Sequence, residues 1–333
     1  MFFQIHDEIG GKNLKFLGLS ILRSEYHRRW TDYYVLSKHV FRKKEADDGK
    51  VGIAFYHGKN FGDELNPFFM DVLGVDYQPF SYQEADLVCV GSILHNLTSP
   101  VPRKIDMNGD YLMHVWGSGF MFPAASDEYL SRNVKIHALR GELSKLRCEK
   151  LLGKTLPEVV LGDPGLLTSR FFPRDDVSPQ WDVGIIPHFF DTGSEFLRRI
   201  QLKKYRSHLI DAGSGPEAVI YAIRNSRMIL SSSLHGLILA DSYNIPNQWI
   251  RLSDQVLGGN YKFDDYYSAF GMRDKKPVDL RDDEITDEDI NRIVGQYEDK
   301  CQQVSEISDA LLECFPFKSK ASFRGCNKRE ESK

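Results

Sequence analysis

Short apolar runs alternate with longer amphipathic stretches along most of the chain. An apolar run bounded by glycine or polar residues predicts a buried strand, whereas apolar residues at helical spacing predict a helix. Strands that alternate with helices are typical of a parallel sheet covered on both faces. We expect strands at 51–56, 86–90, 111–116, 134–139, 159–161, 181–186, 207–211, 228–231 and 248–252, and helices at 63–73, 142–152, 216–225 and 237–243.

An aromatic and proline-rich stretch at 171–180 interrupts this alternation. It separates one set of strands and helices, within 49–175, from a second set within 176–316. A length of 333 residues also suggests two domains. The sequence therefore predicts an α/β protein with two open domains that face a cleft.

The N-terminal segment, 1–48, follows a different pattern. Residues 16–23 and 34–42 are each an apolar or aromatic run that ends in a basic residue, which predicts a short β-hairpin. Basic side chains are interleaved with aromatic ones here. This composition suits an anionic membrane surface, and it equally suits a solvated hairpin that packs on the domain by its apolar side.

The C-terminal region predicts one more helix. Apolar residues recur at three- and four-residue steps from Ile290 to Leu311, and Thr286 is placed to cap the helix. We expect this amphipathic helix to cover the core of its own domain. Residues 317–333 are expected to form a polar tail with frayed structure.

The composition restricts the classes of function. The chain is 41% hydrophobic and 27% charged with a net charge of -4, so nothing indicates a nucleic-acid partner. Its five cysteines are scattered without a C-x-x-C pair, which favours neither a zinc site nor a disulfide framework. No apolar stretch is long enough to span a membrane, and the first residues lack the layout of a signal peptide. We therefore expect a cytoplasmic protein.

Glycine, serine and charged residues gather where the predicted strands end. Open parallel sheets bind ligands beyond the carboxyl ends of their strands. The glycines can be explained as strand terminators alone, Asp63 as a helix cap, and Arg140 as an ion-pair partner of Glu142 or Glu149. The functional interpretation is a single cleft lined by Asn60, Gly62, Asp63, Ser92, His95, Gly117, Ser118, Arg140 and His188, and less firmly by His114.

The segment 231–246 carries the most informative chemistry. Three serines, His235 and Gly236 stand between a predicted strand and a predicted helix. A helix N-terminus attracts anions because its first N–H groups lack partners. A histidine at that point can transfer protons near neutral pH. A serine cap followed by a core histidine explains the same residues without a function.

Six short segments together resemble the polysaccharide pyruvyl transferase family. In family order they are Asn60–Asn66, Val115–Gly119, Leu139–Ser144, Gly162–Pro164, Ile186–His188 and Ser231–Pro246. The resemblance covers roughly 51–275 and implies a GT-B-like fold of two Rossmann-like domains that face a cleft. It implies the acceptor side in 49–175 and the donor side in 176–316.

The resemblance also implies a reaction. Phosphoenolpyruvate would donate its enolpyruvyl group to a sugar of a bacterial surface polysaccharide, or of its lipid-linked precursor, to form a pyruvate ketal. No metal or other cofactor would be required. His235 would be the acid, Asp63 would position or deprotonate a sugar hydroxyl, and the donor would be bound by Arg140, Ser232, Ser233, Gly236 and Lys262.

The chain departs from the family pattern at one position. Many members have an arginine two residues before the histidine, where this chain has Ser233. The candidates to replace that cation are Lys59, Arg224, Arg251 and Lys262. The segment 1–48 lies outside the match and resembles the N-terminal segments of bacterial enzymes that build lipid-linked glycans. That resemblance would place the protein at the inner face of the cell membrane.

Two other classes of function fit the same architecture, because a fold does not determine a reaction. One is a nucleotide-sugar glycosyltransferase of surface-glycan synthesis. The other is a glycan-binding protein without catalytic activity.

Overall fold

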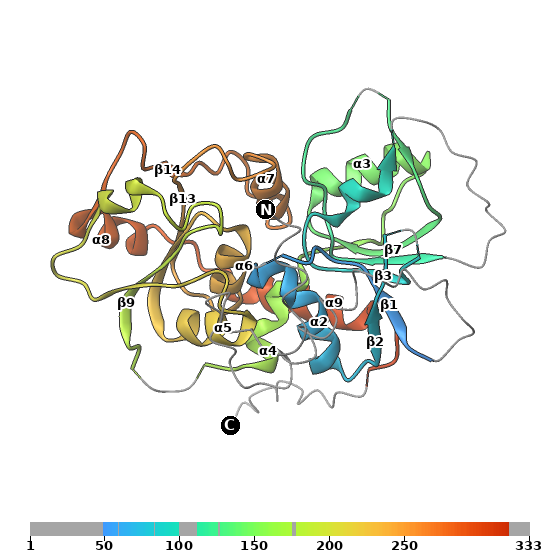
Figure 1. Ribbon diagram of the computed structural model, residues 1–333, viewed down its shortest axis with the longest axis horizontal. Helices are drawn as coiled ribbons and strands as arrows, with labels where there is room; N and C mark the ends of the chain where they lie inside the picture. The colour runs from blue at the N-terminus through green and yellow to red at the C-terminus, as the bar shows by residue number, and fades with distance from the viewer. Residues whose placement is uncertain are drawn as a thin grey trace, which may run out of the picture.

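The protein is an α/β molecule built around two parallel sheets (Figure 1). The computed structural model describes residues 49–319 except 59, 83, 100–111, 126 and 175–177. The predicted hairpin in 1–48 and the tail from residue 320 lie outside the described residues. So does Lys59, one of the four candidate cations.

The first sheet has six parallel strands in the order β2-β1-β3-β5-β7-β8. They are β1 (Val51–Ile53), β2 (Tyr77–Pro79), β3 (Leu87–Val88), β5 (Met113–Trp116), β7 (Val134–Leu139) and β8 (Val160–Leu161). Its helical elements are α2 (Phe61–Leu73), η2 (Ile93–Leu97), α3 (Glu142–Leu152), η3 (Pro164–Leu167) and α4 (Thr168–Phe171). The five strands expected from the sequence are confirmed, β7 with the predicted bounds and the other four with shorter ones, and β2 is added at the edge.

The second sheet has five parallel strands in the order β11-β9-β12-β13-β14. They are β9 (Trp181–Ile186), β11 (Ser207–Leu209), β12 (Ser226–Ser231), β13 (Asn247–Arg251) and β14 (Val278–Asp279). The helices of this half are α5 (Pro216–Arg224), α6 (Leu234–Ser242) and α7 (Tyr261–Ser268), which connect its strands, and α8 (Asp287–Gly295) and α9 (Cys301–Glu313), which follow them. Two minor ladders pair β4 (Thr98–Ser99) with β6 (Tyr129–Leu130) and β10 (Ile200–Gln201) with β15 (Ile285–Thr286), and η4 (Glu195–Arg199) precedes β10.

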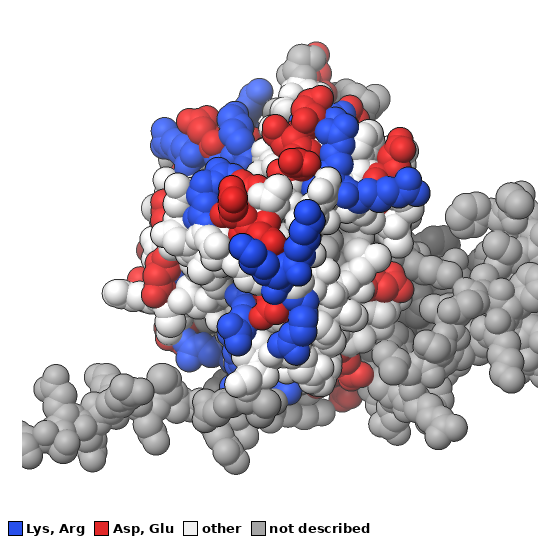
Figure 2. Space-filling view, turned by 90° about the vertical axis from the view of Figure 1, so that its left-hand side faces the viewer, with Lys and Arg blue, Asp and Glu red and all other residues white. Residues whose placement is uncertain are grey.

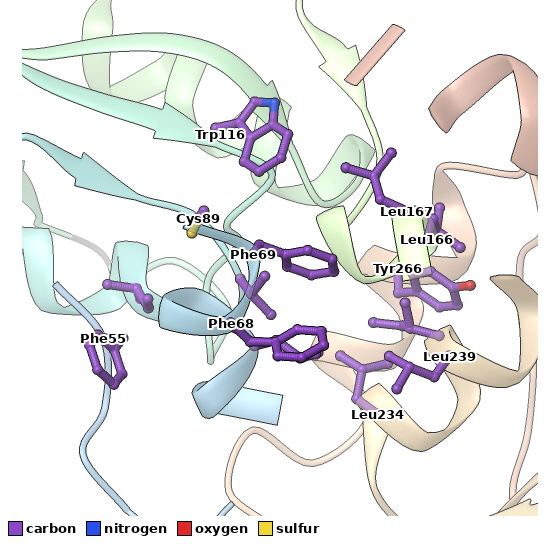
Figure 3. Packing of buried hydrophobic residues seen from close by; sticks show 14 of the residues in the cluster. Phe55, Phe68, Phe69, Cys89, Trp116, Leu166, Leu167, Leu234, Leu239 and Tyr266 are labelled. Carbon is purple, nitrogen blue, oxygen red and sulfur yellow. The ribbon is translucent and has the colours of Figure 1, made fainter. Parts of the chain in front are cut away.

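One hydrophobic cluster joins the two halves of the molecule. Figure 3 shows Phe68 and Phe69 of α2 beside Leu234 and Leu239 of α6. Phe68 also stacks on Phe172, with ring centroids 5.2 Å apart. Because α2 belongs to the first half and α6 to the second, burial of these side chains fixes the two halves against each other.

The predicted helix from Ile290 to Leu311 is wrong as a single element. The structure divides it into α8 and α9, and residues 296–300 between them are not helical. The interruption lets the Tyr297 hydroxyl and the Lys300 ammonium reach the buried carboxylate of Asp241, each at 2.9 Å. Pairing of a buried charge overrides the helical periodicity at this point. The prediction of Thr286 as the cap is confirmed, because its N–H and its hydroxyl both donate to Asp289.

Helix α9 packs against β8 and η3 of the first half, as well as against α6. The indole of Trp116 on β5 donates to the carbonyl of Leu311, with a distance of 2.8 Å between the two atoms. The C-terminal helix therefore ties the second half back to the first sheet.

The outer face of the second half is shown in Figure 2. On that face the Lys and Arg side chains are interspersed with Asp and Glu, and no single sign of charge dominates the view. None of the helices within the described ranges combines the length and the hydropathy needed to cross a lipid bilayer.

Candidate active site

A cavity of about 290 Å³ opens between the two halves, and we call it the first cavity. Residues that follow strands of both sheets line it, as expected for ligand sites of open α/β sheets. The sequence-predicted residues around it are Asn60, Asp63, Ser92, His95, His188, Ser233, His235 and Lys262. The cavity thus brings together residues that are far apart in sequence: Asn60 and His188, for example, are separated by 128 positions.

The N-terminus of α2 forms one wall of the first cavity. Asn60 caps this helix, since its side chain accepts from the N–H of Gly62. The Asn60 amide also donates to Asp63 at 2.6 Å. Burial raises the pKa of Asp63 to about 6, although that hydrogen bond and nearby Lys262 oppose the shift. Asp63 is therefore both a member of the cap and a carboxyl group that can exchange a proton near neutral pH.

Gly62 allows this helix to approach the second half. A Cβ atom at Gly62 would lie 2.0 Å from Nδ1 of His235, which no side-chain carbon can do. The N–H of the neighbouring Phe61 donates to the carbonyl of Ala212, also in the second half. Gly62 is thus required for the close contact between α2 and His235. It is not among the described residues that line the first cavity.

The serine turn between β12 and α6 forms the opposite wall. Ser231 is structural, because its hydroxyl bonds the backbone of Ile186 and Ser233 and accepts from the N–H of Ser233. Ser232 turns away from the first cavity: its hydroxyl donates to Asp191 and accepts from the N–H of His188. Of the three serines, Ser233 lines the first cavity.

His235 lies on the first turn of α6 and is 8% exposed. Its Nε2 atom faces Oδ2 of Asp163 at 3.9 Å, beyond hydrogen-bond distance. Neither atom has a hydrogen-bond partner among the residues that the structure describes. Burial, then the charges of Lys262, Arg140 and His188, lower the pKa of His235 to about 3.

Asp163 joins this pair from the first half. It follows β8 and caps η3, where its other carboxylate oxygen accepts from the N–H of Gly165 at 2.8 Å. Burial raises its pKa to about 6, although Gly165 and Arg140 oppose the shift. At 3.9 Å the carboxylate acts on the imidazole through its charge, which favours the protonated ring.

Lys262 supplies the positive charge of the first cavity. It is the only lysine or arginine among the described residues that line this space. Burial and nearby Arg140 lower its pKa to about 8, while the carboxylates of Asp63 and Asp191 oppose the shift. The ammonium is charged at neutral pH and suits an anion. Burial and the charge of Lys262 also lower the pKa of His188 to about 3.

Arg140 lies behind the cavity wall. Its side chain is 0% exposed and forms an ion pair with Asp265 of α7 at 2.9 Å. Its other nitrogens donate to the Ser92 hydroxyl at 2.8 Å and to the carbonyl of Phe120. The pairing with Glu142 or Glu149 that local sequence allows is not the observed one. Arg140 orients Ser92, and direct contact with a donor stays a prediction that this packing does not favour.

Several other predicted residues support the site from outside the first cavity. The Ser118 hydroxyl donates to the carbonyl of Gly91, and Gly117 adopts a positive φ of 84° against Pro164. Gly236 packs against Ser231, where a Cβ atom would lie 2.4 Å from the hydroxyl oxygen. His114 instead stacks on His137 and contacts Phe317, away from the lining.

The other candidate replacements for the family arginine lie elsewhere. Arg224 bonds the carbonyl of Pro173, and Arg251 lines a separate cavity described below. Among the candidates that the structure describes, Lys262 is the one placed beside His235 in the first cavity.

Sequence reasoning missed three carboxylates that organise the site, at Asp163, Asp191 and Asp265. Asp163 stood in a recognised segment but was given no role, and the partners of Asp191 and Asp265 are distant in sequence. Helix α7, which carries Asp265 and Lys262, was missed altogether. The signal for this helix is the spacing of its buried aromatic residues, Phe263, Tyr266 and Tyr267, which Phe270 continues just beyond the end of the helix.

Comparison with known proteins gives a consistent result. The model of the family described as polysaccharide pyruvyl transferase matches residues 8–254. The uncharacterized protein L143 of Acanthamoeba polyphaga mimivirus is 25% identical over 225 residues, which are 66% of this chain and 73% of that protein. The succinoglycan biosynthesis protein ExoV of Rhizobium meliloti (strain 1021) is 28% identical over 223 residues. This alignment covers 65% of the present chain and 63% of ExoV, less than two thirds of that relative.

Replacing Arg140 tests its structural role. We expect Arg140→Ala to lower the free energy of unfolding by about 3–5 kcal/mol, because it leaves the Asp265 carboxylate buried without its counter-charge. The matched control is Arg206→Ala, whose side chain is 66% exposed and lies 3.5 Å from Asp182, and this change costs at most about 1 kcal/mol. Urea denaturation measures both, and equal effects would contradict the interpretation.

Replacing Gly62 tests the contact between α2 and His235. We expect Gly62→Ala to lower the free energy of unfolding by about 1–3 kcal/mol, because its methyl group must displace the imidazole. The control is Gly193→Ala, where no atom lies within 4 Å of the new Cβ, and its effect stays within about 0.5 kcal/mol. A shift of the His235 ring signals in G62A but not in G193A, measured by NMR, identifies the contact. Unchanged ring signals in G62A would show that the contact is absent.

Proposed function

The chain belongs to the polysaccharide pyruvyl transferase family, and on that premise we propose that it transfers the enolpyruvyl group of phosphoenolpyruvate to a saccharide, forming a pyruvate ketal. The family implies a transferase that acts on a polysaccharide. We assign the reaction to the first cavity, with a GT-B-like division into an acceptor side in the first half and a donor side in the second.

The observation that carries this proposal is the position of Lys262 beside His235, two buried side chains that line the same cavity. Phosphoenolpyruvate carries a carboxylate and a phosphate, and its reaction begins with proton transfer. The site therefore needs a cation and a titratable group in one place. Ser233 and Lys262 line the same cavity, and we assign to Lys262 the charge that an arginine carries in many family members.

Donor binding uses the second half. The ammonium of Lys262 pairs with an anionic group of the donor, and the free N–H groups at the start of α6 add partial positive charge. The Ser233 hydroxyl lines the same space and donates to the donor. Arg140 acts at one remove, because it holds Ser92 in the wall.

Proton delivery requires a change in His235. The His235 pKa of about 3 keeps the imidazole neutral at pH 7. A bound anion favours the imidazolium, so donor binding brings a proton with it. The Asp163 carboxylate stabilises that imidazolium from the side opposite the solvent, and the imidazolium then serves as the acid.

The atoms of the reaction balance as follows. The imidazolium gives one proton to the methylene carbon, which becomes a methyl group, and C2 becomes electrophilic. One sugar hydroxyl adds to C2 and loses its proton to Asp63. The C2–O bond to phosphate then breaks, and the second hydroxyl closes the ketal. Of the two hydroxyl protons released, one leaves on the phosphate and the other restores the acid.

The place of the acceptor in the cell is also a proposal. The basic and aromatic side chains of 1–48 suit an anionic lipid surface, which a lipid-linked saccharide at the inner face of the membrane would provide. The printed name of ExoV, succinoglycan biosynthesis protein, supports a surface glycan as the product class.

The direct test compares ligands by thermal unfolding and by release of inorganic phosphate. Phosphoenolpyruvate should raise the unfolding midpoint, since ligand binding stabilises the folded state, whereas nucleotide sugars should not.

Lys262→Met should weaken phosphoenolpyruvate binding about 10–100-fold, because it removes one charge-assisted hydrogen bond. Wild-type affinity should also fall as pH rises through about 8, where Lys262 loses its proton.

Lys145→Met is the matched control for this experiment, because Lys145 pairs with Glu142 outside the first cavity. It should leave the midpoint shift unchanged. Stabilisation by a nucleotide sugar with no response to phosphoenolpyruvate would replace the proposal by the glycosyltransferase alternative.

Asp163→Asn tests the role given to the imidazolium. Loss of the carboxylate lowers the pKa of His235 in the donor complex. Because the imidazolium is the active form, activity should fall as pH rises, and this fall should begin about one pH unit lower than in the wild type. Asp309→Asn, at an exposed ion pair, should keep the wild-type profile. A reduced kcat with an unshifted pH profile would mean that Asp163 has only a structural role.

A further inference from the structure

A second cavity of about 360 Å³ lies beside the first, at the carboxyl end of β13. Trp249 and Arg251 of that strand line it, together with the loop that leads to α7 and carries Ser253, Asp254 and Val256. The proposed transfer reaction uses none of these side chains.

The two cavities are neighbouring compartments of one groove. Phe122 of the first half and Leu257 of the second line both of them. The serine turn between β12 and α6 lies between the two cavities: Ser233 lines the first and Ser232 lines the second. The second cavity is therefore the space that adjoins the first for a longer ligand.

The charges in the second cavity do not suit another anion. Arg251 is the only lysine or arginine among its described lining residues, and it is engaged by Asn260 and by Asp279. Asp191 adds a buried carboxylate, which accepts from the hydroxyls of Ser232 and Ser253. A diphosphate bound here would meet the carboxylates of Asp191 and Asp254 and an arginine that is already paired, in contrast to the first cavity with Lys262.

The lining instead combines hydroxyl and carboxylate groups with aromatic surface. Trp249 is 3% exposed and stacks on Phe263, with ring centroids 4.1 Å apart and an angle of 11°, so it forms a rigid floor. The exposed apolar surface of this lining comes from Phe122 and Leu257. Asp254 is 77% exposed, and its carboxylate retains acceptor capacity beyond its pairing with Arg281. A neutral ligand that presents hydroxyl groups on one side and C–H groups on another fits this lining.

Exposed apolar side chains mark the route into the groove. Tyr56, Phe122, Phe190 and Leu257 are between 37% and 56% exposed, and all four line the first cavity. Large apolar side chains gathered at the mouth of a cavity indicate a ligand-binding surface. Aromatic rings at such a mouth offer flat faces to the C–H face of a sugar ring.

We propose that the second cavity binds the sugar unit next to the one that is modified, so that the acceptor is an oligosaccharide at least two units long. This inference rests on the proposed function for the identity of the first cavity. It adds a recognition site and makes chain length, rather than the terminal sugar alone, a determinant of acceptor choice.

The test fills the second cavity and leaves the first unchanged. Val256 lines only the second cavity, so Val256→Trp occupies it with an indole. Val294→Trp is the matched control, at a 45% exposed position on α8 that lines neither cavity. Saturation-transfer NMR measures binding of hexose disaccharides and of their monosaccharides, in α- and β-linked forms, with UDP-glucose as a comparison ligand.

With the wild type and with V294W, we expect saturation to be transferred to the NMR signals of both rings of the disaccharide. In V256W its affinity should fall about tenfold, with loss of saturation on one ring only, while monosaccharide binding is unchanged. If V256W lowers the unfolding midpoint more than V294W does, Val256→Phe makes the same test with a smaller side chain.

Three outcomes would overturn the inference: no disaccharide binds, V256W leaves both rings saturated, or UDP-glucose is the ligand that V256W displaces. The measurement needs no turnover, so it separates this inference from the proposed function. Disaccharide binding that V256W weakens, in a protein that never releases phosphate from phosphoenolpyruvate, would refute the reaction and keep the sugar site.

Discussion

The buried ion pair between Arg140 and Asp265 is the constraint on which the rest of the site depends. It joins the end of β7 in the first half to α7 in the second, and both side chains are 0% exposed. Asp265 also accepts from the N–H and the hydroxyl of Ser144, so the carboxylate is held by both neighbours. A charge buried this deeply tolerates little displacement, because any lost hydrogen bond leaves it unpaired in a dry environment. The pair therefore fixes α7, and with it Lys262, relative to the first sheet.

The same burial that fixes the geometry also sets the chemistry. Burial keeps His188 and His235 neutral. It lowers the pKa of Lys262 to about 8 and raises the pKa values of Asp63 and Asp163 to about 6. In such a cavity an arriving anion is the largest change in local charge. In the proposed reaction, ligand binding and proton transfer are therefore coupled by electrostatics. The neighbouring second cavity, where the arginine is already paired, lacks this property and suits a neutral sugar.

Particular elements show how far sequence patterns reach. The strands and most helices follow from local periodicity, and the cap at Thr286 follows from its capping box. The prediction of a single long helix over Ile290 to Leu311 fails because Tyr297 and Lys300 bind the carboxylate of Asp241, which lies 56 and 59 residues before them. Arg140 was recognised as important, but its partner was sought among near neighbours such as Glu142. The true partner, Asp265, lies on a helix that local reasoning did not identify.

The sequence by itself determined the α/β class, the parallel strands, and the short segments at their carboxyl ends that carry the family resemblance. Those features depend on neighbours within a few residues, which one chain displays directly. Only the tertiary structure decided that Lys262 faces the first cavity, that Arg140 lies behind its wall, and that Asp163 meets His235. These contacts join residues from both halves of the molecule, and they are selected by burial and charge pairing in three dimensions, which no local pattern encodes.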